Sequence, residues 1–202
     1  MYKLKQLTYN YQDLEPYIDT HTMGLHRNKH HKTYLKNLNN LLGNNNYNFS
    51  HPIEELPRHL KEIKDEDIND VLFNWGGVVN HNLYWESINP NNKQNPTDKL
   101  LEKITNKYTS FDNFKKIFTD IALKLKGSGY TFLVIKPNND IDIINTSNQD
   151  SPLELGYTPI FNVDMWEHAY YLNYKNNKKE YLENFFDIAN FNYANKITNN
   201  NF

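Results

Sequence analysis

A segment rich in proline and asparagine, NPNNKQNPTDKL (residues 89–100), separates two parts of the chain with different hydrophobic periods. Before it, apolar residues recur at the spacing of amphipathic helices, whereas short β-branched and aromatic runs dominate after it. Such segments are typical of domain boundaries. The sequence therefore predicts an α+β fold, with an N-terminal domain over residues 1–90 and a C-terminal domain over residues 91–202.

Two long helices are predicted in the N-terminal part. Apolar spacing favours a helix over residues 19–42 that is stopped by Gly43. A second helix is expected over residues 67–88, where Asp67 is a good cap and a proline follows the last turn. Together they predict an antiparallel helical hairpin.

The C-terminal part is predicted to be an α/β domain with a small three-stranded antiparallel sheet. Two helices and then three strands are expected over residues 98–107, 110–126, 130–135, 141–144 and 158–164. A final helical region should run from Glu167 into the 180s, with a break near residues 174–178.

Composition excludes several classes of function. The chain has no cysteine, so disulfides, thiolate metal sites and thiol nucleophiles are absent. The net charge of −2 is made of interspersed charges, which predicts no nucleic-acid partner. No apolar run reaches membrane-spanning length, and the N-terminus lacks a signal-type apolar core. We expect a cytoplasmic protein without a membrane partner; a targeting peptide ahead of the present N-terminus stays compatible with this.

Ionisable groups stand beside bulky apolar residues in the stretch VDMWEHAYY, where Asp164 and His168 are four residues apart. Such groups are costly to bury unless they are paired or bound to a metal. In the first predicted helix, His26, His30 and Tyr34 follow one stripe, and His81 lies on the second helix. A lone helical histidine is more often an ordinary core or surface residue, so none of these positions identifies a site alone.

The pair Gly76-Gly77 is unusual in the middle of a helix, where each glycine costs about 1 kcal/mol relative to alanine. Gly77 lies one turn before His81, so a side chain from elsewhere could enter there and reach whatever His81 binds. With His26, Asp164 and His168, His81 would complete a set of three imidazoles and one carboxylate. That set suits Fe, Mn or Zn, and does not identify the metal.

Five blocks of sequence, in order, resemble the iron/manganese superoxide dismutases: MGLHRNKHHKTYLKNLN, FNWGGVVNHNLYW, GSGYTFLVI, NQDSPL and VDMWEHAYYLNYKN. The resemblance covers essentially the whole chain. It implies a helical-hairpin domain, an α/β domain and a mononuclear metal between them, with His26, His81, Asp164 and His168 as ligands. It also implies disproportionation of superoxide to dioxygen and hydrogen peroxide by ping-pong redox cycling of the metal.

The resemblance further predicts one manganese ion per chain, with iron as the second option. Glycine at position 77 together with Gln149 is the pairing of the manganese type, in which Gln149 fills the glycine gap and reaches the metal-bound solvent. Val78 and Trp75 depart from the usual manganese pattern, and Tyr130 and Phe132 replace tryptophans.

Further roles are implied by the resemblance. Tyr34 and His30 would relay protons and gate access. Glu167 and Tyr171 would cross to the partner in a homodimer or a tetramer, and Glu167 would accept a hydrogen bond from the partner's ligand histidine. Two alternatives stay open: a non-haem iron oxygenase, which typically uses two histidines and a carboxylate, and a metal-binding protein without turnover.

Overall fold

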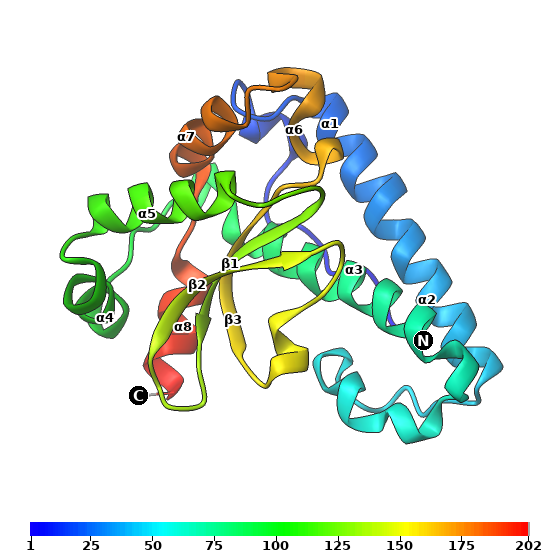
Figure 1. Cartoon of the computed structure of the whole chain (residues 1–202). Helices are drawn as coiled ribbons and strands as arrows, with labels where there is room; N and C mark the ends of the chain where they lie inside the picture. The colour runs from blue at the N-terminus through cyan, green and yellow to red at the C-terminus, as the bar shows by residue number, and fades with distance from the viewer. Residues whose placement is uncertain (202) are drawn as a thin grey trace.

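The computed structural model describes residues 1–201, and its N-terminal half is a pair of long helical segments. The first is continuous through α1 (Thr20–Leu25), η2 (His26–His31) and α2 (Lys32–Asn44), and the second is α3 (Ile68–Ser87). In Figure 1 the first segment forms one straight arm that meets α3. The predicted helical hairpin is confirmed.

A leucine stripe holds the hairpin together. Leu35, Leu38 and Leu42 of α2 are buried in one cluster with Val71 and Trp75 of α3. These positions repeat at three- and four-residue spacing, which places them on one face of each helix. The connection between the helices contains the short helices η3 (Ile53–Glu62) and η4 (Asp65–Asp67).

Two predicted helix ends differ from the structure. Gly43 lies inside α2, and the chain instead turns at Asn46, which has a φ of 54°. Asp67 precedes α3 as predicted, but its carboxylate accepts a hydrogen bond from the Asn45 side chain at 2.8 Å and does not cap the helix. Both differences have one cause: asparagines rather than glycine organise this turn, because asparagine tolerates the left-handed region and bonds locally.

The C-terminal half contains α4 (Asp98–Tyr108), α5 (Phe111–Leu123) and then β1 (Gly129–Ile135), β2 (Ile141–Ser147) and β3 (Thr158–Asp164). Within residues 1–201 these strands form an antiparallel three-stranded sheet in the order β2-β1-β3. In the register of β1 and β3, Tyr130 lies opposite Asp164. The fold class predicted from the sequence is therefore confirmed.

Both faces of the central strand β1 are covered, as its unbroken burial requires. Leu133 belongs to a large aromatic core that includes Phe118 of α5 and Phe161 of β3, whose rings lie 5.6 Å apart. Phe132 faces the opposite cluster with Leu83 of α3. Figure 1 shows α3 passing behind the strands and α5 above them in the view. The sheet is thus fixed against the helix that carries His81.

The last helices are α6 (Glu167–Tyr174), α7 (Lys178–Ile188) and α8 (Asn192–Asn201). The break that was predicted near residues 174–178 separates α6 from α7. The sequence analysis missed α8, whose asparagine-rich composition resembles a loop. No helix within residues 1–201 is long and apolar enough to span a membrane.

Candidate metal centre

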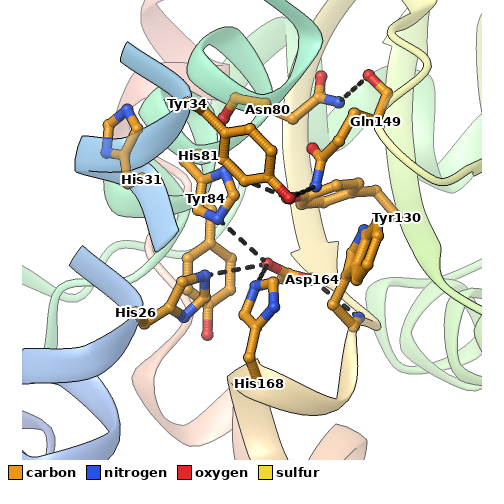
Figure 2. A network of polar contacts seen from close by, with 12 residues as sticks. His26, His31, Tyr34, Asn80, His81, Tyr84, Tyr130, Gln149, Asp164 and His168 are labelled. Carbon is orange, nitrogen blue, oxygen red and sulfur yellow. Dashed lines mark hydrogen bonds and ion pairs between the residues drawn. The ribbon is translucent and has the colours of Figure 1, made fainter. Parts of the chain in front are cut away.

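Four side chains converge where the helical hairpin meets the sheet: His26 at the start of η2, His81 in α3, Asp164 at the end of β3 and His168 in α6. One ligand atom of each lies within 4.8 Å of all the others. Figure 2 shows the three imidazoles surrounding the Asp164 carboxylate. The sequence-predicted set is therefore brought together from four separate elements.

The spacing of these atoms suits a bound cation. Asp164 Oδ2 lies 3.0 Å from His26 Nε2, 3.3 Å from His168 Nε2 and 3.8 Å from His81 Nε2. Ligand atoms about 2.0–2.2 Å from a common ion would be separated by roughly 3 Å or slightly more. Within residues 1–201, the Nε2 atoms of His26 and His81 are buried without a hydrogen-bond partner. Buried polar atoms rarely lack partners, so a cation between them fits the arrangement.

Burial and charge determine the protonation states of the ligand set. Burial alone would raise the pKa of Asp164, but the neighbouring His168 and His26 imidazoles hold this pKa well below its usual range. Burial lowers the pKa of His26 to about 4 and that of His81 well below its ordinary value. At neutral pH the buried part of the site therefore offers a carboxylate and neutral imidazoles, which are the forms that bind metals.

Hydrogen bonds outside the cluster hold the ligands in position. His81 Nδ1 donates to the Gly77 carbonyl at 2.5 Å, which leaves Nε2 for the cluster. Asp164 Oδ1 accepts from the Trp166 backbone N–H at 2.8 Å, and the Asp164 carbonyl accepts from the Tyr181 hydroxyl at 3.0 Å. These hydrogen bonds fix the orientation of the Asp164 carboxylate and of the His81 imidazole.

The two glycines of the pair are contacted by different groups. A Cβ at Gly77 would lie 2.5 Å from the Tyr34 ring, whereas a Cβ at Gly76 would lie 1.9 Å from the Gln149 carbonyl oxygen. The Tyr34 ring therefore packs on Gly77, and the Gln149 backbone packs on Gly76. The contact between Tyr34 and Gly77 was not predicted, and the reach of the Gln149 amide to a metal-bound solvent stays a prediction.

Tyr34 and Gln149 nevertheless meet beside the ligands. Gln149 is buried, and its Nε2 donates to the Tyr34 hydroxyl at 3.1 Å (Figure 2). The Gln149 carbonyl accepts from Asn80 Nδ2 at 3.0 Å, which ties the loop to α3. Burial raises the pKa of Tyr34, so its hydroxyl keeps its proton at neutral pH. The pair can hold a proton next to the ligand cluster.

The two adjacent histidines of η2 have different positions. His30 is partly exposed, and its ring stacks on ligand His168 at 4.1 Å. His31 is buried, stacks on His81 at 5.1 Å and accepts a hydrogen bond at Nδ1 from Trp85 Nε1 at 3.0 Å. The position of His31 beside the ligand His81 was not predicted from the sequence. A helix with 3.6 residues per turn turns it away from His26, but the wider π-helical turn of η2 returns it to that side.

Glu167 and Tyr171 point away from the ligand cluster. Both residues are exposed on α6, and Tyr171 keeps 47% of its surface exposed, next to Leu172 with 49%. Within residues 1–201 they therefore add nothing to the metal environment.

The close contacts at the glycine pair lead to a stability prediction. Gly76→Ala should lower the free energy of unfolding by about 1–3 kcal/mol, because the new methyl group meets backbone that cannot move aside easily. The cost of this close contact exceeds the gain of about 1 kcal/mol that alanine has over glycine in helix propensity. Gly43→Ala is the matched control, since a Cβ there meets nothing within 4 Å and should be neutral or stabilising. Urea denaturation measures both; equal stabilisation of the two variants would contradict the packing at Gly76.

Comparison with known proteins gives matches over both halves of the chain. The model of the α-hairpin domain of iron/manganese superoxide dismutases matches residues 1–89, and the model of their C-terminal domain matches residues 96–197. A protein of Listeria innocua named superoxide dismutase (Mn) is 40% identical over 195 residues, which cover 96% of each chain. One of Methylomonas sp. named superoxide dismutase (Mn/Fe) is 40% identical over 189 residues, 94% of this chain and 93% of its own.

Proposed function

The chain belongs to the iron/manganese superoxide dismutase family, and from this premise we propose that His26, His81, Asp164 and His168 hold its metal ion. The protein is a superoxide dismutase, which converts superoxide to dioxygen and hydrogen peroxide. The convergence of three imidazoles and one carboxylate between the hairpin and the sheet carries the assignment of the ligands. The ion held by these residues would supply the one-electron redox chemistry that ping-pong disproportionation of superoxide needs.

The enzyme uses one manganese or iron ion per chain, and we propose manganese as the preferred metal. Relatives 40% identical to the chain are named for Mn and for Mn/Fe. Gly77 and Gln149 also follow the pairing of the manganese type. Val78 and Trp75 depart from that type. Elemental analysis of protein purified from its native source measures the metal preference.

The residues around the ligands would handle protons and exclude water. Tyr34 keeps its hydroxyl proton at neutral pH and is held by the Gln149 amide, so this pair would deliver protons from the solvent side to the site. His30 stacks on His168 at a partly exposed position and would control entry. Tyr130 and Trp85 are buried beside the ligands and would keep the site dry.

A superoxide-dismutation assay combined with elemental analysis tests the function. Protein loaded with manganese should be active with close to one ion per chain, and protein freed of metal should be inactive. Activity that did not follow manganese or iron content would contradict the proposal.

We also propose that the enzyme is a homodimer or a tetramer, with an interface that includes α6. Tyr171 and Leu172 present large apolar surfaces there, and Glu167 lies beside them in the first turn. In the dimer, Glu167 would accept a hydrogen bond from the partner's His168, and Tyr171 would reach the partner's His30. A carboxylate in that position would orient a ligand imidazole and raise its basicity.

Glu167→Ala should therefore weaken dimerisation and metal retention together. We expect about a 10–100-fold loss in metal affinity, the usual cost of removing a group that orients a ligand. Glu183→Ala on α7 is the control. This substitution also removes the charge of an exposed glutamate, but at a position away from the proposed interface. Sedimentation and metal analysis are the measurements. A fully metallated, active monomer in Glu167→Ala would overturn the proposed interface.

We further propose that the chain divides into two domains, over residues 1–90 and 91–202. We also propose that the protein is located in the cytoplasm. Expression of residues 1–90 alone tests the first, and cell fractionation tests the second.

A further inference from the structure

We propose that His51, His59 and Glu62 form a further metal site, which takes a borderline divalent cation such as Zn²⁺. These residues lie in the connection between α2 and α3, at and just before the short helix η3. Their ligand atoms lie within 4.8 Å of one another. None of them belongs to the redox centre or to the proposed dimer contact on α6.

Both imidazoles approach one carboxylate oxygen. His51 Nε2 lies 3.4 Å and His59 Nδ1 lies 3.2 Å from Glu62 Oε1. Ligand atoms in a tetrahedral Zn²⁺ site with bonds of about 2.0–2.2 Å are separated by about 3.3–3.6 Å. The two observed separations to Glu62 Oε1 are close to these values, and a rotation that opens the stack of the two rings would admit the ion.

The two rings are parallel, with centroids 3.6 Å apart and an interplanar angle of 15°. Each nitrogen lone pair lies in the plane of its own ring, so binding of one ion by both nitrogens would separate the stacked rings. The negative charge of Glu62 would attract a divalent ion to this point. Two nitrogens and one oxygen without thiolate also suit Zn²⁺, Cu²⁺ or Ni²⁺ better than Mg²⁺ or Ca²⁺. Zn²⁺ is proposed among these ions because it commonly takes nitrogen and oxygen ligands together with a water molecule.

The backbone that carries the ligands is held in place. The His51 carbonyl accepts from the Tyr2 hydroxyl at 2.9 Å, and Ser50 N–H donates to Asn48 Oδ1 at 3.1 Å. Leu56 and Ile63 anchor the segment in the core of the hairpin domain. The ligand set is therefore partly organised before a cation binds, which lowers the entropy cost of binding.

Exposure and charge favour an ion from solution. The side chains of His51, His59 and Glu62 keep 27%, 22% and 29% of their surface exposed, which leaves room for water as a fourth ligand. Acidic residues outnumber basic ones from Ile53 to Asp67. Ion binding would close the loop from His51 to Glu62 and stabilise the connection, which is tied to α3 by the bond from Trp75 Nε1 to the Ile53 carbonyl at 2.6 Å.

Zn²⁺ titration of the manganese-loaded enzyme, without an affinity tag, tests the site by calorimetry and elemental analysis. We expect one additional Zn²⁺ per chain, with manganese content unchanged. His51→Ala and Glu62→Gln should each weaken this binding at least about tenfold, because each removes a direct ligand. His21→Gln is the matched control: it removes an exposed histidine of α1 and should leave the titration unchanged.

Diffraction at the zinc edge from crystals of the wild-type enzyme soaked in Zn²⁺ gives a second test that does not depend on the variants folding. The expected result is an anomalous peak about 2.0–2.1 Å from His51 Nε2 and His59 Nδ1. The proposal is overturned if no additional Zn²⁺ binds, if binding persists in both variants, or if the peak lies elsewhere.

Discussion

Gln149→Ala is expected to lower turnover by about 10–100-fold while leaving the metal content close to that of the wild type. Gln149 is buried and does not belong to the ligand cluster, but it donates to the Tyr34 hydroxyl at 3.1 Å. Truncation would leave that hydroxyl without its donor and open space for water beside the ligands. A 10–100-fold loss corresponds to about 1.4–2.7 kcal/mol in the barrier.

Pulse radiolysis with metal analysis measures this effect. Ser147→Ala, at the exposed end of the same strand-and-loop segment, is the control and should keep full activity. Tyr34→Phe removes the hydroxyl but keeps the ring over Gly77, so it should matter less at low superoxide flux and more at saturation. Unchanged turnover in Gln149→Ala would refute the role given to the amide.

The largest effect is expected for Asp164→Asn, which should lower metal affinity by more than about a hundredfold and abolish activity. The substitution keeps the size of the side chain but removes its negative charge, so the ion would be held without charge compensation in a buried site. The loss should exceed the usual 10–100-fold effect of groups outside the ligand shell.

Stability of the metal-free protein distinguishes a ligand from a structural carboxylate. The Asp164→Asn variant can still accept the hydrogen bond from Trp166 N–H, but it loses the charge that the lowered pKa of Asp164 marks as favourable in the folded state, so the metal-free form should unfold at a modestly lower temperature. The additional stability conferred by metal should disappear entirely. Asp150→Asn, an exposed carboxylate in the loop after β2, is the control. A metal-free variant that unfolds far below the wild type would indicate a structural role instead.

The sequence predicted the elements whose periodicity is strong and the residues whose chemistry is costly to bury. The hairpin helices, the order of the strands and the convergence of His26, His81, Asp164 and His168 are all present in the structure. Three histidines at one point count against a non-haem iron oxygenase, which typically uses two.

What the sequence did not predict depends on local backbone geometry and on packing across the fold. The π-helical turn of η2 brings His31 beside His81, and helical spacing alone would not place it there. The packing of the Tyr34 ring on Gly77 and of the Gln149 backbone on Gly76 depends on how α2 and the loop after β2 meet α3. The paired histidines of the α2–α3 connection are eight residues apart on irregular backbone, so their stacking has no periodic signal.

The central claim is that one redox-active ion is held by His26, His81, Asp164 and His168. Anomalous diffraction at the manganese and iron absorption edges, on protein purified from its native source, tests this claim most directly. We predict one peak per chain at the centre of these side chains, strong at the manganese edge and about 2.0–2.2 Å from the three Nε2 atoms and the Asp164 carboxylate. The absence of a manganese or iron peak at this centre, or a centre filled by zinc alone, would contradict the assignment of these four ligands.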